Sequence, residues 1–124
     1  MIRVSINNIL CNFNMQIKKQ IIDEKYVTKF IAEIDGKQVG RAFLCLIYNE
    51  LHKEPYGLLE DVFVDGEYRS HGIGRELVKA IIEEAKAQGC YKLVGFSRYS
   101  REQIHRFYKS LGFQDYGVEF RIDF

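Results

Sequence analysis

The sequence of 124 residues predicts one α/β domain, spanning residues 1–124, in which two helices cover a mixed sheet. Two observations lead to this prediction. Strand-like runs in the N-terminal half are joined by turn signals, which favours antiparallel pairing. In the C-terminal half, strand-like and helical patterns alternate, which favours parallel pairing through a right-handed crossover. The expected order is a set of N-terminal antiparallel strands followed by strand–helix–strand–helix–strand.

The N-terminal strands are predicted from runs rich in β-branched and aromatic residues. Lys25–Ile34 and Gln38–Tyr48 are two such runs, and the Asp35-Gly36 step between them is a strong hairpin signal. Ile2–Ile6 alternates as in a strand. Over Leu10–Ile22 a strand period and a helix period compete. Because asparagines in that stretch disfavour a helix, we expect a long strand there.

The C-terminal half alternates between the strand period and the helix period. A helix over Glu76–Gln88 is predicted from the apolar stripe of Leu77, Ile81 and Ala85. Gly89 is expected to end this helix as its C-cap. Strands are expected at Gly57–Val64, Tyr91–Ser97 and Val118–Phe124, and a second helix at Arg101–Ser110.

Charge and composition exclude several classes of function. The 18 basic and 17 acidic residues nearly cancel, so no basic field favours binding to nucleic acid or to a membrane surface. No apolar run approaches the ~20 residues that cross a bilayer, and no segment resembles a signal peptide. The three cysteines, Cys11, Cys45 and Cys90, lack metal-ligand spacing and indicate reduced thiols. We therefore expect a cytoplasmic protein without a metal site.

A glycine-rich loop follows the strand expected at Gly57–Val64. It has the pattern Arg69-x-x-Gly72-x-Gly74 and opens directly into a helical pattern. Backbone N–H groups at the positive end of a helix bind phosphate groups. The two glycines allow an anion to approach the main chain closely, and Arg69 and Arg75 add charged donors. The loop is thus predicted to bind a pyrophosphate.

A second motif, Phe107-Tyr108-x-x-x-Gly112-Phe113, lies downstream of the loop. In this order and spacing the two motifs resemble the GCN5-related N-acetyltransferase (GNAT) superfamily, and the resemblance covers Gly57–Phe124. It implies the GNAT fold and acetyl-CoA as cosubstrate. The two helices that usually separate the first two strands of that fold have little room here, so we expect them to be reduced or absent. Leu59-Glu60-Asp61-Val62 adds a weaker similarity to glucosamine-6-phosphate N-acetyltransferases.

The resemblance also implies where the coenzyme binds. The strand holds the pantetheine and polarises the thioester, and the loop holds the pyrophosphate. This assigns the coenzyme to Val62, Phe63, Val64, Arg69, Ser70, His71, Gly72, Ile73, Gly74 and Arg75. His71 is expected to contribute its backbone N–H and to expose its ring. Arg101 stands where the superfamily often has a coenzyme-contacting asparagine, and it either reaches a phosphate or faces solvent.

Two residues are expected to carry the acid–base chemistry. Tyr108 matches the superfamily's tyrosine near the coenzyme sulfur, where its hydroxyl protonates the departing thiolate; the alternative is a tyrosine of the core. Glu60 is the candidate base for the acceptor amine, and attraction of a cationic substrate is its alternative role. Neighbouring carboxylates of a strand point to opposite faces, so only one of Glu60 and Asp61 faces the site unless the strand carries a bulge.

The predicted function is direct transfer of an acetyl group from acetyl-CoA to a primary amine of a small molecule. A protein or peptide amine is the alternative acceptor, and a coenzyme-A-binding module without catalysis is the alternative function. Because the part of the chain ahead of the hairpin is short, the acceptor pocket is expected either to be open or to be completed by a homodimer partner.

Overall fold

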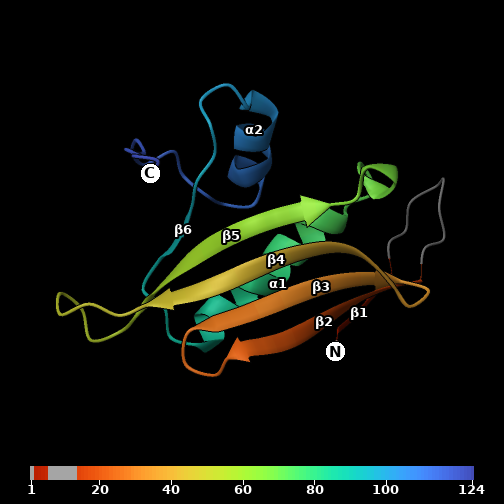
Figure 1. Ribbon diagram of the computed structural model, residues 1–124, viewed down its shortest axis with the longest axis horizontal. Helices are drawn as coiled ribbons and strands as arrows, with labels where there is room; N and C mark the ends of the chain where they lie inside the picture. The colour runs from red at the N-terminus through yellow and green to blue at the C-terminus, as the bar shows by residue number, and fades with distance from the viewer. Residues whose placement is uncertain (1, 6–13) are drawn as a thin grey trace.

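The computed structural model, which describes residues 2–5 and 14–124, contains one mixed sheet of six strands (Figure 1). The strands follow the chain order across the sheet, from β1 at one edge to β6 at the other. Neighbours are antiparallel from β1 to β5, whereas β5 and β6 are parallel. The strands are β1 Ile2–Ser5, β2 Asn14–Asp23, β3 Val27–Ile34, β4 Lys37–Ile47, β5 Tyr56–Val64 and β6 Leu93–Gly95; the helices are α1 Ile73–Ala87 and α2 Glu102–Ser110, and the 3-10 helix η1 is Gly66–Tyr68.

The hairpin and the long N-terminal strand are confirmed. Asp35 and Gly36 both have positive φ, 50° and 79°, as a two-residue type I′ turn between β3 and β4 requires. From Asn14 onward the stretch with two competing periods forms β2, as expected, and residues 6–13 lie outside the described residues. Ahead of η1, the described ranges contain strands, turns and loops but no α-helix, which agrees with the expected reduction of the two helices.

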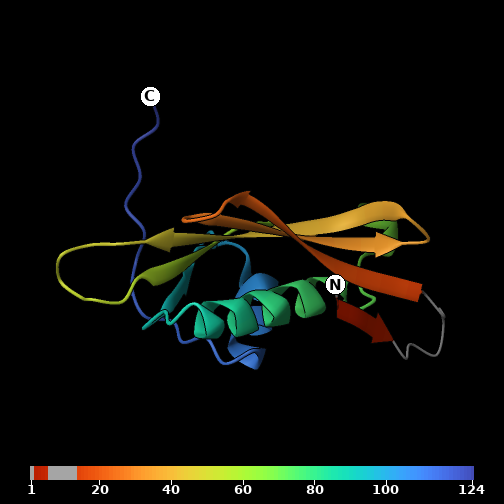
Figure 2. The ribbon, with the colours of Figure 1, turned by 90° about the horizontal axis from the view of Figure 1, so that it is seen from below.

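Helix α1 covers one face of the sheet and forms the centre of the core (Figure 2). Leu77, Ile81 and Ala85 are buried, as their spacing predicted, and Ile73 and Val78 widen the buried stripe. Helix α2 lies on the same side of the sheet as α1 (Figure 2). No helix in the described part of the chain is long and apolar enough to cross a membrane.

Leu77 is one of the core residues whose truncation should destabilise the fold, because it is 0% exposed. Leu77→Ala leaves a cavity between α1 and the sheet, so we expect the free energy of unfolding to fall by about 2–5 kcal/mol. Urea denaturation followed by circular dichroism measures this change. Lys79→Ala, a change to an exposed side chain of the same helix, should stay within about 0.5 kcal/mol of the parent. Equal effects of the two variants would contradict the assigned core face.

Three expectations for the C-terminal half are corrected. Helix α1 begins at Ile73 rather than Glu76, so part of the predicted loop belongs to the first helical turn. Strand β6 spans only Leu93–Gly95 of the range expected from Tyr91 to Ser97. The strand expected at Val118–Phe124 is wrong, because these residues pair with none of the described strands and project beyond the sheet (Figure 2). A period of two predicts an extended chain, but a strand also needs a neighbour to bind.

Candidate active site

The strands β5 and β6 pair over three residues only, ending at Leu59 and Gly95. Beyond that point, none of the described residues pairs with the β6-facing edge of β5, from Glu60 to Val64. A cavity of about 180 Å³ opens where the strands part. Its lining includes Glu60, Asp61 and Val62 from β5, Phe96 and Ser97 after β6, and Arg101, Ile104, Phe107 and Tyr108 from the α2 region. The cavity therefore brings the two predicted acid–base residues, Glu60 and Tyr108, to one place.

Strand β5 carries a β-bulge at its two acidic residues, Glu60 and Asp61. Two residues of β5, Asp61 and Val62, lie opposite one residue of β4, and Asp61 has a positive φ of 49°. The carboxylate of Asp61 accepts a hydrogen bond from Arg41 Nε at 2.7 Å. Glu60 forms no ion pair with any described residue, although it also lines the cavity. Both acidic residues line the cavity, and Arg41 pairs with the Asp61 carboxylate, whereas Glu60 has no ion pair with any described residue.

The loop after β5 ends in the uncapped N-terminus of α1. Ser70 and Gly72 both have left-handed backbones, with φ of 66° and 83°, and these turn the chain into the helix. No described side chain caps the helix at Gly72, and the first backbone bond at this end runs from Glu76 N–H to the Gly72 carbonyl. The N–H groups of the first helical turn have no acceptor within the helix, and this is the arrangement that binds anions.

The arginines of the loop are held by neighbouring groups. Arg69 Nε donates to the Val64 carbonyl oxygen at 2.9 Å, and its guanidinium lies 5.5 Å from the centroid of the Phe63 ring. Arg75 Nη1 donates to Ser110 Oγ at 3.1 Å and so ties the start of α1 to the end of α2. Both side chains are exposed, and each guanidinium keeps further N–H groups for an anion. His71 is half-buried, so its ring is less exposed than expected.

The turn that ends α2 fixes the surroundings of Tyr108. Gly112 has a φ of 97°, and the Phe113 N–H donates to the Tyr108 carbonyl at 3.1 Å, which is the Schellman end of a helix. This turn sets the Phe113 ring at 5.2 Å from the Tyr108 ring, and the Phe107 ring lies 5.4 Å away on the same helix. Burial raises the pKa of the Tyr108 phenol, and the charge of Arg101 partly opposes this. A phenol with a raised pKa keeps its proton at neutral pH and can donate it.

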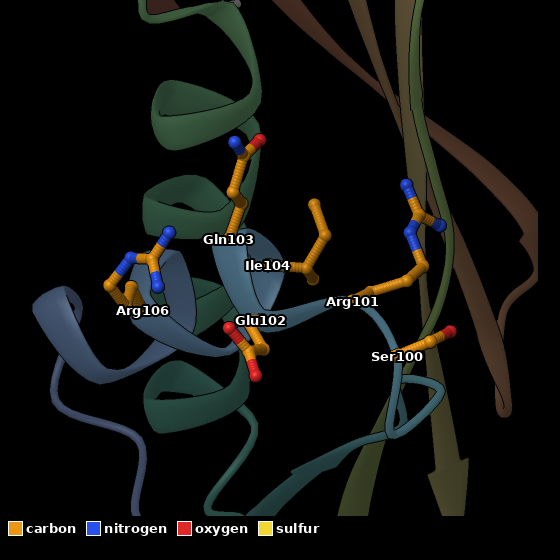
Figure 3. Close-up of a pocket in the computed structure, with 6 residues that line it drawn as sticks. All are labelled: Ser100, Arg101, Glu102, Gln103, Ile104 and Arg106. Carbon is orange, nitrogen blue, oxygen red and sulfur yellow. The ribbon is translucent and has the colours of Figure 1, made fainter.

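A second hollow, of about 380 Å³, surrounds the first turn of α2 (Figure 3). It is lined by Ser100, Arg101, Glu102, Gln103, Ile104 and Arg106. In Figure 3 the Arg101 side chain points away from α2 toward the sheet. Arg101 and Ile104 line both this hollow and the cavity between β5 and β6, so the two are neighbours. Arg101 is exposed and stands between them.

The family model described as Acetyltransferase (GNAT) family matches residues 9–113. The chain belongs to this family. The glucosamine 6-phosphate N-acetyltransferase of Trypanosoma brucei brucei is 37% identical to this GNAT chain over 100 residues, which cover 78% of the chain. The matched region spans 65% of the length of that relative.

Solved structures have the same fold as this GNAT chain. An acetyltransferase from Agrobacterium tumefaciens strain C58 superposes with a TM-score of 0.75 at 33% identity, covering 78% of this chain and 68% of that one. The aminoglycoside N-acetyltransferase AAC(6')-Iy, solved in complex with CoA, superposes with a TM-score of 0.69 at 23% identity, covering 83% and 70%. At 23% identity, the comparison with AAC(6')-Iy shows a shared fold and nothing more.

The sequence did not predict several residues at the cavity of this GNAT chain. Arg41 lies 20 residues from Asp61, and only the register of β4 against β5 brings them together. Phe96 and Ser97 were expected to be the last two residues of a strand, whereas they lie beyond β6 and line the cavity. Their position just after an apolar strand run was the only available signal. The described residues contain no group of three or more His, Cys, Asp or Glu side chains that could hold a metal ion.

Proposed function

We propose that this protein is an acetyl-CoA-dependent N-acetyltransferase that moves an acetyl group directly to a primary amine of a small molecule. One observation carries the proposal: Glu60 of β5 and Tyr108 of α2 line the same cavity, and β5 leads into the uncapped N-terminus of α1. Strand β5 thus connects the cavity proposed for acetyl transfer with the helix N-terminus proposed to bind the phosphate groups.

The residues present fit the coenzyme. The first turn of α1, with Gly72 and Gly74, offers backbone N–H groups to the pyrophosphate, and Arg69 and Arg75 add positive charge. A Cβ on Gly72 would meet no atom within 4 Å, so the space in front of the turn is open. The unpaired edge of β5 from Glu60 to Val64 supplies backbone groups for the amides of the pantetheine arm. When bound, acetyl-CoA supplies the activated acetyl group.

Acetyl transfer requires three contributions from the protein. The acceptor ammonium must lose a proton, and the Glu60 carboxylate takes it directly or through a water molecule. Backbone N–H groups along the edge of β5 stabilise the negative charge that develops on the thioester oxygen as nitrogen attacks the carbonyl carbon. The carbon–sulfur bond then breaks, and the Tyr108 hydroxyl gives its proton to the leaving sulfur. The acylated nitrogen loses its remaining extra proton to the Tyr108 oxygen, directly or through a water molecule, which leaves the neutral amide. A raised pKa suits this role, because the phenol stays protonated until the thiolate forms.

The acceptor is proposed to be an amine on a sugar-like small molecule. Two of the proteins compared above are named for amino sugars or aminoglycosides, both of which carry amines on sugar rings. The charge of Glu60 at the cavity favours a cationic acceptor. Cys45 and Cys90 are free thiols, which fits our proposal that the protein works in the reducing cytoplasm.

Acetyl-CoA binding is tested by thermal stabilisation of a matched pair of variants. Gly72→Ala puts a side chain at a φ of 83°, whereas Gly66→Ala, six residues earlier, changes a glycine whose φ is not positive. Because a left-handed L-residue costs roughly 1–2 kcal/mol, we expect Gly72→Ala to weaken acetyl-CoA binding about tenfold as the turn reshapes. Gly66→Ala should bind like the parent. A parent protein that acetyl-CoA does not stabilise would defeat the proposed function.

Catalysis is tested with a panel of amines and detection of the free thiol of coenzyme A. We expect thiol release with amino sugars or aminoglycosides and none without an amine. Release with peptides alone would assign the protein or peptide amine as acceptor instead. Binding of acetyl-CoA without turnover on either class would indicate a coenzyme-A-binding module.

A further inference from the structure

A row of three side chains crosses the face of the sheet that α1 and α2 leave uncovered. Lys29 of β3 lies directly opposite Phe43 of β4, and Phe43 lies directly opposite Glu60 of β5. Residues paired in this way share one face of a sheet. Leu44 and Leu59 are buried in the core, and each is next in the chain to a residue of the row. Because successive side chains of a strand alternate, the row points away from the two helices (Figure 2).

The two ends of the row carry opposite charges that the protein does not neutralise. Neither Lys29 nor Glu60 forms an ion pair with any described residue. By contrast, Lys18 on the same face of the sheet pairs with Glu33 at 2.7 Å. A charge without a counter-charge favours a ligand group of the opposite sign. The row therefore suits a ligand that is anionic at one end and cationic at the other.

The middle of the row is an aromatic ring. Phe43 is half-buried, and the ammonium of Lys29 lies 5.6 Å from the centroid of its ring. Binding sites for small molecules combine an apolar or aromatic surface with a few charged or polar groups that fix the orientation of the ligand. The faces of a sugar ring carry C–H groups, which pack against such a surface. The three residues thus provide all the parts of a small-molecule site in one line.

The length of the row limits the size of the ligand. Neighbouring strands lie about 4.8 Å apart, so the Cα atoms of Lys29 and Glu60, two strands apart, are separated by roughly 10 Å. The side chains at both ends reach into this space and shorten the gap between their charges. The remaining span fits one sugar ring that has an amine on one side and an anionic substituent on the other.

We propose that Lys29, Phe43 and Glu60 bind an acceptor that is an amino sugar with an anionic group, a phosphate or a carboxylate. Lys29 binds the anion, Phe43 packs against the ring, and Glu60 binds the amine. Glu60 also lines the cavity between β5 and β6, so an acceptor on the row has its amine where acetyl transfer is proposed. The inference rests on the proposed function and narrows its acceptor. Aminoglycosides carry several ammonium groups and no anion, so Lys29 disfavours them.

The first test compares three acceptors by kcat/KM. Glucosamine has no anionic group, glucosamine 6-phosphate has a phosphate, and 2-amino-2-deoxyglucuronate has a carboxylate. We expect at least one of the two anionic sugars to exceed glucosamine by about tenfold or more, as a charge-assisted contact provides. The better of the two identifies the anion. Equal values for all three acceptors, or a preference for aminoglycosides over both anionic sugars, would overturn the proposal.

The second test changes the charge at position 29. Lys29→Met keeps the apolar stem, so we expect it to raise KM for the preferred anionic sugar about tenfold while kcat, and kcat/KM for glucosamine, stay near the parent values. Lys29→Arg should restore the preference. Lys29→Glu should reverse it in favour of aminoglycosides, which loss of folding cannot do. Lys18→Met removes a paired lysine of the same face and should have no effect. An equal loss for all acceptors in Lys29→Met would show a structural lysine instead.

The third test measures binding without acetyl-CoA and therefore without the proposed reaction. Each anionic amino sugar is titrated into the parent, and the amide chemical shifts are followed by NMR. We expect the amides of Lys29, Phe43 and Glu60 to shift, and the shifts to weaken in Lys29→Met. A protein that does not bind acetyl-CoA would defeat the proposed function and leave this result standing. A protein that acetylates glucosamine but shows no shifts in the row with either sugar would overturn this inference alone.

Discussion

Tyr108→Phe should leave a folded protein that binds acetyl-CoA and turns over slowly. The variant loses only the hydroxyl, and the ring keeps its contacts with Phe107 and Phe113. Loss of a general acid lowers rates by roughly 100- to 10,000-fold, so we expect kcat to fall within that range. The stabilisation by acetyl-CoA and the free energy of unfolding should remain near those of the parent. Steady-state kinetics with thiol detection measures the rate.

A matched control separates the hydroxyl of Tyr108 from tyrosine hydroxyls in general. Tyr99 is 76% exposed and does not line the cavity, so Tyr99→Phe should keep the parent rate. If Tyr108→Phe also keeps the parent rate, Tyr108 is a tyrosine of the core, and the proton for the sulfur comes from elsewhere. A variant that loses acetyl-CoA binding together with turnover would point to a structural role.

The elements that the sequence predicted well depend on local interactions. The stripe of Leu77, Ile81 and Ala85 defines a helix face by itself, and Asp35-Gly36 determines its own turn. Tyr108 was assigned from a family motif and Glu60 from its place on the strand ahead of the loop, and both roles stay proposals. The cavity shared by the two residues is what the structure adds.

The features that the sequence did not predict depend on neighbours far along the chain. The bulge at Asp61 is a property of how β5 pairs with β4, and the partner of Asp61 is a residue 20 positions away. Strand β6 ends where it separates from β5, and the apolar run in the sequence does not indicate this point. Val118–Phe124 has the period of a strand but pairs with no strand in the described part of the chain, so its pattern predicted conformation and not pairing.

Glu60→Gln should lower kcat strongly while leaving acetyl-CoA binding intact. Glutamine keeps the size of the side chain but cannot accept a proton from the acceptor ammonium. We expect a loss of roughly 100- to 10,000-fold in kcat near neutral pH, the range found for a missing general base. The loss should shrink as the pH rises toward the pKa of the acceptor amine, because solvent then supplies the neutral amine without help.

The acidic neighbour of Glu60 provides the control and the contrary outcome. Asp61 is already paired with Arg41, so Asp61→Asn should affect turnover less than Glu60→Gln, although it releases the charge of Arg41. If Glu60 only attracts a cationic acceptor, Glu60→Gln should raise KM and leave kcat at saturation close to that of the parent. This comparison is informative because both acidic residues line one cavity, and only Glu60 is without an ion pair among the described residues.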